Sequence, residues 1–122
     1  MASSASKQEP APVSSEQPHI ADMVRNDVGM FLGGGAICRD IMARKEEGIK
    51  KYGMPLQPFN GRCATMDLYQ ELLDAANYMR QKMYEDSNEH SWSAPKDWLE
   101  NYQKLLSLIQ FVYAKLPVEN RW

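Results

Sequence analysis

Apolar residues recur every three to four positions along most of this 122-residue chain, the spacing that places them on one face of an α-helix. The pattern predicts helices over residues 20–32, 36–52 and 64–84, and a fourth helix that starts at Ser93-Ala94-Pro95. The fourth segment carries a narrow stripe, which consists of Trp98, Tyr102, Leu105, Ile109, Val112 and Leu116. No stretch alternates between apolar and polar residues as a half-buried strand would. We therefore expect an all-α fold, a small helical bundle.

The apolar faces of the other three segments are broad. They contain Ile20, Val24, Val28 and Phe31 in the first segment, Ile37, Cys38, Ile41, Ile49 and Tyr52 in the second, and Leu68, Leu72, Ala75, Met79 and Met83 in the third. A glycine run at 33–35 and Gly53 are expected to end the first two helices. So much apolar surface in a short chain favours a bundle completed by oligomerisation, as a homodimer or homotetramer, over a monomeric bundle.

Composition separates a polar tail from the rest of the chain. Residues 1–18 are mostly Ser, Ala, Pro, Glu and Gln, so we expect a disordered tail, followed by a single all-α domain over residues 19–122. The net charge of −2 argues against general nucleic-acid binding, and no apolar run is long enough to cross a membrane. The chain begins without a signal-peptide-like apolar run, and Cys38 and Cys63 form no CxxC pair. A cytoplasmic protein is the simplest interpretation.

A row of polar side chains lies beside the apolar face of the third segment. Within about 60° of one another on a helical wheel are Asp67, Glu71, Asp74 and Tyr78. Like charges at this spacing repel, and a divalent cation would relieve the repulsion. Mg²⁺ suits such a row because it binds carboxylate oxygens and keeps waters that a phosphate can replace. The alternative is a solvated acidic helix face with no ligand.

The second segment offers further acids, Asp40, Glu46 and Glu47, and their spacing alone does not choose between the two glutamates as metal ligands. Residues 36–62 carry six Lys or Arg against three acids, whereas residues 63–90 carry two against six. A basic segment facing an acidic helix suits a metal-bound polyphosphate, whose oxygens would contact Lys50, Lys51 and other cations. Charge pairing between helices explains the distribution equally well.

The loop over residues 53–62 is rich in turn residues. Asn60-Gly61 predicts a tight turn that puts Arg62 at the start of the third helix. A helix N-terminus with an arginine nearby favours an anion. A plain connector capped by Asn60 is the alternative.

The stretch GIKKYGMPLQPFNGRCATMDLYQELLDAANYMRQ resembles phage-encoded members of the MazG-like, all-α nucleoside triphosphate pyrophosphohydrolases. The sequence ELLD at 71–74 matches the second, ExxD, element of that family. The first element, ExxE, is altered, because Ala43 and Arg44 stand three residues before the two glutamates of the second segment. The resemblance implies a helical dimer or tetramer that uses Mg²⁺ to cleave a (deoxy)nucleoside triphosphate into a monophosphate and pyrophosphate. MazZ-type phage members act on dATP and dGTP, so the resemblance points to purine dNTPs in phage nucleotide metabolism.

On this hypothesis the all-α domain is catalytic and works in the host cytoplasm. The expected catalytic residues are Glu47, Glu71 and Asp74, and the expected ligands of Mg²⁺, or alternatively Mn²⁺, are Glu46, Glu47, Glu71 and Asp74. The expected substrate-binding residues are Lys50, Lys51, Asn60, Arg62 and Tyr78. The alternative function is that of a non-catalytic nucleotide-binding or partner-docking helical protein.

Overall fold

The computed structural model describes residues 10–87 and 96–120. The regular structure in these ranges is entirely helical and comprises α1 (Ile20–Phe31), α2 (Gly35–Tyr52), α3 (Ala64–Asp86), α4 (Lys96–Lys115) and a short 3₁₀ helix, η2 (Val118–Asn120). The all-α prediction is confirmed, and the first three helices begin and end within two residues of their predicted bounds. The predicted start of the fourth helix at 93–95 lies outside the described residues. None of the described helices is long and apolar enough to span a membrane.

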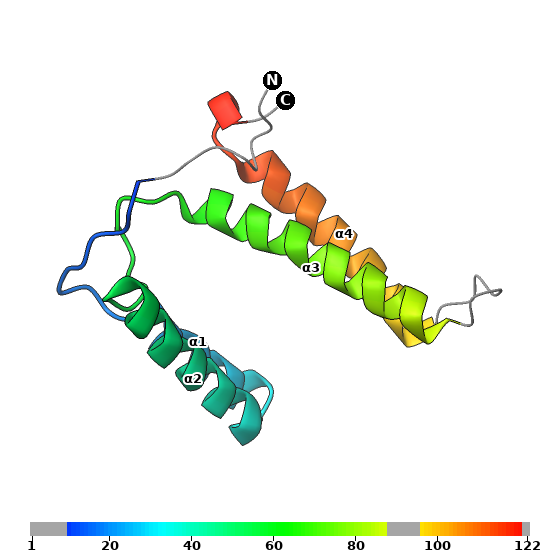
Figure 1. Cartoon of the computed structure of the whole chain (residues 1–122), viewed down its shortest axis with the longest axis horizontal. Helices are drawn as coiled ribbons and strands as arrows, with labels where there is room; N and C mark the ends of the chain where they lie inside the picture. The colour runs from blue at the N-terminus through cyan, green and yellow to red at the C-terminus, as the bar shows by residue number, and fades with distance from the viewer. Residues whose placement is uncertain (1–9, 88–95, 121–122) are drawn as a thin grey trace. The chain divides into compact units, whose positions relative to one another are not determined.

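The chain divides into two compact helix pairs, one over Pro10–Arg62 and one that begins at Cys63. In the first pair α1 packs against α2, and in the second α3 packs against α4. Figure 1 shows that the two helices of each pair lie side by side and run in opposite directions. Each pair is therefore an antiparallel helical hairpin.

Glycines with positive φ end both helices of the first pair, as their sequence positions predict. Gly33 has φ +64° and donates its backbone N–H to the carbonyl of Val28 at 3.0 Å. Gly53 has φ +79° and donates to the carbonyl of Ile49 at 2.7 Å. The bond from Gly53 gives the Ile49 carbonyl a partner at the end of α2, whereas the Val28 carbonyl also accepts the backbone N–H of Leu32 at 2.8 Å.

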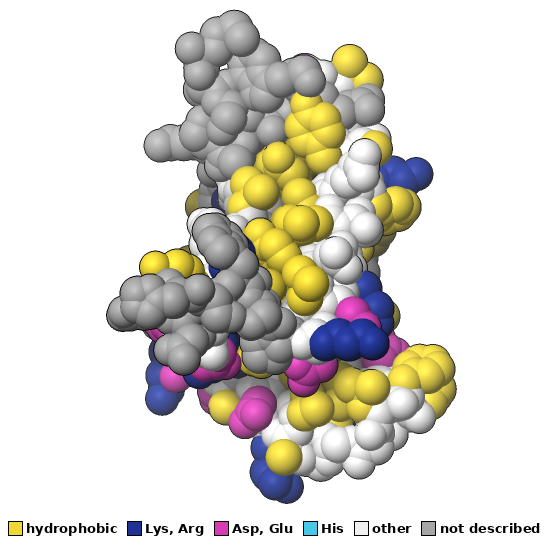
Figure 2. Space-filling view, turned by 90° about the vertical axis from the view of Figure 1, so that its right-hand side faces the viewer, with side chains coloured by type: hydrophobic (Ala, Val, Ile, Leu, Met, Phe, Trp, Pro, Cys, Tyr) yellow, Lys and Arg dark blue, Asp and Glu magenta, His cyan; other side chains and the backbone are white. Residues whose placement is uncertain are grey.

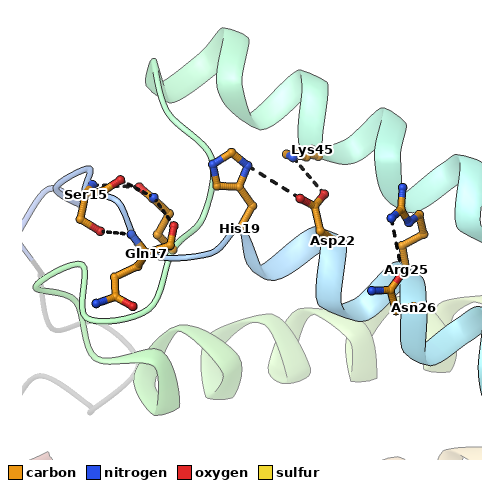
Figure 3. A network of polar contacts seen from close by, with 8 residues as sticks. Ser15, Gln17, His19, Asp22, Arg25, Asn26 and Lys45 are labelled. Atoms are coloured by element: carbon orange, nitrogen blue, oxygen red, sulfur yellow. Dashed lines mark hydrogen bonds and ion pairs between the residues drawn. The ribbon is translucent and has the colours of Figure 1, made fainter.

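An ion pair links the two helices of the first pair (Figure 3). The ammonium of Lys45 on α2 donates to the carboxylate of Asp22 on α1 at 3.0 Å, and the Lys45 side chain is only 13% exposed. This hydrogen bond lowers the pKa of the Asp22 carboxyl below its ordinary value of 3.8. The Lys45 side chain is thus largely removed from solvent while its charge has a defined partner.

The second pair contains the buried apolar side chains, which are Met66, Met83, Val112 and Leu116. The rings of Tyr69 on α3 and Tyr113 on α4 lie 5.8 Å apart and are tilted by 49°, a favourable aromatic geometry. The predicted stripe of the fourth segment is confirmed, since all six of its residues are buried or half-buried. Leu68 differs from the prediction, because its side chain is 46% exposed. A single partner helix covers only part of an apolar face as broad as that of α3.

Residues 10–18, called the strap below, contain no helix or strand and run along the loop that follows α2 (Figure 3). The backbone N–H of Val13 donates to the carbonyl of Asn60 at 3.0 Å, and the guanidinium of Arg62 donates to the carbonyl of Pro10 at 2.7 Å. Their composition predicts a disordered tail, but in the structure these residues have partners more than 35 positions away in sequence. Residues 1–9, which the same prediction includes, lie outside the described residues.

Large apolar side chains remain exposed in both pairs, and Figure 2 shows a run of hydrophobic groups on one face. The most exposed of them at the end of α1 are Met30, Phe31 and Leu32, at 66–76%. Neither α1 nor α2 contains a buried residue. Such surfaces are typical of chains that pack further in an assembly, so oligomerisation stays a prediction that this exposure supports.

Candidate functional site

The polar row predicted on the third segment lies on α3 and is largely open to solvent. Glu71 and Asp74 are exposed one helical turn apart, Tyr78 is 70% exposed, and Asp67 in the first turn is half-buried. The residues of the row are thus accessible to a ligand, with Asp67 the most enclosed of the four. The row supplies two neighbouring exposed carboxylates and a phenol hydroxyl from one rigid helix.

The donor chemistry of this row fits a hard divalent cation. Mg²⁺ is commonly held by one or two carboxylates and completes its shell with water and substrate phosphate oxygens. Glu71 and Asp74 present the right kind of oxygen at i,i+3 spacing on an exposed face. Over residues 10–87 and 96–120, no three or more His, Cys, Asp or Glu side chains gather closely enough to hold a metal ion. The described residues therefore bring together one part of the predicted metal site, namely the carboxylates of Glu71 and Asp74 on α3.

The last two turns of α2 form an open hollow. It is lined by Arg44, Glu47, Gly48, Lys50, Lys51 and Tyr52. Three of these residues are cations and one is an aromatic ring, and the ammonium of Lys51 lies 5.2 Å from the centroid of the Tyr52 ring. This combination provides positive charge for phosphate oxygens and a flat apolar surface beside it.

The glutamates of α2 differ in their contacts. The carboxylate of Glu47 lies 3.1 Å from the guanidinium of Arg44, one turn earlier on the same helix. Both side chains are largely exposed, so the pair contributes little to stability. Glu46 is exposed as well and does not line the hollow. The contact with Arg44 distinguishes Glu47 as the glutamate in a cationic setting.

The turn predicted at Asn60-Gly61 is confirmed in the loop after α2. Gly61 has φ +85°, and the side-chain oxygen of Asn60 accepts the backbone N–H of Arg62 at 3.1 Å. Asn60 is buried, with 8% exposure, so its side chain braces the loop. It does not cap α3, because that helix has Cys63 as its N-cap and no side-chain cap bond. Arg62 is half-buried and its guanidinium contacts the strap.

The structure therefore brings the predicted residues together in three groups. The groups are Glu47 with Lys50 and Lys51 in the hollow, Asn60 with Arg62 in the loop, and Glu71 with Asp74 and Tyr78 on α3. The first two belong to one helix pair and the third to the other. A metal ion shared by the acids of α2 and α3 stays a prediction.

Sequence reasoning missed three residues that shape these groups. Arg44 and Tyr52 line the hollow. Arg44 stands three residues before Glu47, and Tyr52 directly follows Lys51, so both positions could have been identified from the sequence. The third is Gln57, which is 4% exposed and fastens the strap. No local pattern identifies Gln57, because its partners lie about 40 residues away.

Comparisons with known proteins identify no relative of this chain. No family model matches it, and no curated protein or solved structure is significantly similar to it.

Proposed function

We propose that this protein is a Mg²⁺-dependent nucleoside triphosphate pyrophosphohydrolase that acts on purine dNTPs. The observation that carries the proposal is the exposed pair Glu71 and Asp74, held one turn apart on α3. Neither carboxylate forms an ion pair with a Lys or Arg of the described residues, so the two are suited to a hard cation and its phosphate ligand. The cationic hollow of α2 adds a second supporting feature, because its Lys50 and Lys51 match a polyphosphate in charge.

In the proposed reaction a water oxygen bonds to the α-phosphorus while the bond from that phosphorus to the oxygen bridging to the β-phosphorus breaks. The products are a monophosphate and pyrophosphate, and a carboxylate of Glu47, Glu71 or Asp74 accepts the proton that the water loses. Bound Mg²⁺ would neutralise phosphate charge during this step. Glu46 completes the proposed metal ligands, and the remaining substrate contacts are assigned to Lys50, Lys51, Asn60, Arg62 and Tyr78.

A panel of canonical dNTPs and NTPs, incubated with the protein and Mg²⁺ and separated by ion exchange, tests the activity. We expect a monophosphate and pyrophosphate from dGTP and dATP, and no turnover by Glu71→Gln. That variant should keep the melting temperature of the wild type, since the Glu71 side chain is exposed. Glu85→Gln on the same helix is the matched control, because Glu85 is exposed and, among the described residues, accepts from Gln81 at 3.0 Å. Full activity of Glu71→Gln would refute the assignment.

Nucleotide binding without cleavage is the second candidate function. Ala43 stands where the resemblance expects an acid before Glu46, and the carboxylate of Glu47 contacts Arg44. Both observations reduce the number of carboxylates on α2 that are ready to bind a metal. Saturable binding of dGTP with no product after prolonged incubation would favour this function. A protein that docks onto a partner through its apolar faces would show neither binding nor Mg²⁺-dependent stabilisation.

A further inference from the structure

Phe59 is in an unfavourable position by two measures. Its side chain is 88% exposed, the highest value among the large apolar residues that the structure describes. Its φ is +56°, and it is the single non-glycine residue with positive φ in the described ranges. The left-handed region is uncommon for bulky residues, and strain of this kind gathers at functional sites. An exposed aromatic ring on a strained backbone is therefore a candidate ligand contact.

The surrounding loop holds this conformation in place. Gln57 and Asn60, at 4% and 8% exposure, are the two buried polar residues of the described chain, and they flank Phe59. The Gln57 amide binds three backbone groups of the strap, and Asn60 contacts the strap and the Arg62 backbone. The backbone on both sides of Phe59 is thus anchored while its ring points into solvent. Such a ring is preorganised for a ligand, because the backbone that carries it is already fixed. Binding would restrict little more than the two torsion angles of the Phe59 side chain.

The neighbours of the ring indicate the chemistry of that ligand. Arg62 follows three residues later on the same loop, carries a permanent positive charge and is held by its contact to the Pro10 carbonyl. A flat aromatic face and a guanidinium on one braced loop match a ligand with a flat ring and a negative charge, which describes a nucleotide.

We infer that Phe59 is the residue on which the nucleobase of the bound nucleoside triphosphate stacks, while Arg62 contacts its phosphates. This assignment rests on the proposed function and adds to it the element that recognises the base. Stacking on an aromatic ring tolerates every base, and a larger purine ring covers more of the phenyl face than a pyrimidine does. The residue therefore contributes affinity for the base and a preference for purines.

The test compares a ligand that has a base with one that lacks it. Titration calorimetry measures the Kd of a non-hydrolysable dGTP analogue and of inorganic tripolyphosphate, each with Mg²⁺. We expect Phe59→Ala to raise the Kd of the dGTP analogue by roughly 5- to 150-fold, the range of one lost base–aromatic stack, and to leave the Kd of tripolyphosphate unchanged. Phe59→Tyr keeps a ring and should bind the analogue like the wild type. Phe31→Ala, which removes another exposed ring at 76%, is the matched control and should change neither Kd.

Each outcome decides between distinct conclusions. An unchanged Kd of the analogue in Phe59→Ala overturns the stacking assignment and leaves the proposed function intact. Equal loss of both ligands also overturns it, because the ring would then support the loop and not the base. No binding of the analogue by the wild type refutes the proposed function together with this inference. The Phe59→Ala variant should fold, since an 88% exposed side chain has few contacts to lose.

Discussion

Gln57 fastens the strap through both ends of its amide, and its removal is the most direct test of this arrangement. Its oxygen accepts the backbone N–H of Ser15 at 3.1 Å, and its nitrogen donates to the carbonyls of Ser15 and Gln17, both at 2.7 Å. The side chain is only 4% exposed, whereas Ser15 and Gln17 are exposed. Gln57→Ala removes all three bonds at once and changes no backbone atom.

The size of the effect follows from the number and setting of these bonds. A hydrogen bond contributes about 0.5–1.5 kcal/mol net, so three of them set a range of about 1.5–4.5 kcal/mol. The partners on the strap are exposed and regain water when the amide is lost, which places the expected value near the lower end, at about 2 kcal/mol. Because about 1.4 kcal/mol corresponds to a factor of ten, the strap should open roughly 30-fold more often in Gln57→Ala.

Hydrogen exchange followed by NMR measures this opening directly. The amide of Val13 donates to the Asn60 carbonyl, a bond that Gln57→Ala leaves in place, so it should exchange roughly 30-fold faster in the variant. The amide of Ser15 loses its acceptor in the variant and should lose its protection altogether. The matched control is Gln81→Ala, which removes an exposed glutamine with one bond to Glu85 and should not change exchange in the strap. If the strap amides keep their protection in Gln57→Ala, the hydrogen bonds of the Gln57 side chain do not hold the strap in place.

Two further predictions concern the helix pairs. Leu116→Ala should lower the free energy of unfolding of the full chain by about 2–4 kcal/mol, because Leu116 is 2% exposed. Leu108→Ala is the control, since Leu108 is 44% exposed, and it should lower the free energy of unfolding by less than about 1 kcal/mol. Equal losses for the two variants in urea denaturation would contradict the burial of Leu116 against the helices. The lowered pKa of Asp22 means that its ion pair with Lys45 stabilises the folded state above about pH 4 and that this contribution is lost as the pH falls through the folded-state pKa. Asp22→Asn should therefore be less stable than the wild type at pH 6 and equally stable near pH 2, and a constant difference at both pH values would refute the ion pair.

The helices were predictable because their determinants are local. Each helix shows its apolar spacing within its own residues, and the ends of α1 and α2 lie at glycines whose positive φ the sequence already favours. The residues of the candidate site were predictable to the same extent, since the exposed pair Glu71 and Asp74 belongs to one helical turn. The grouping of Glu47 with two lysines in the hollow follows from the same periodicity.

The remaining features depend on contacts between residues that are distant in sequence. Composition predicts disorder for the strap because it has few apolar residues to bury, yet its backbone groups bind the buried amide of Gln57, about 40 positions away. The strain at Phe59 likewise exists because Gln57 and Asn60 anchor the backbone on either side of it. Local periodicity carries no information on such partners. The sequence alone determined where the helices lie and which carboxylates share a face, and only the tertiary structure decided which polar side chains are buried as braces and which ring is left exposed.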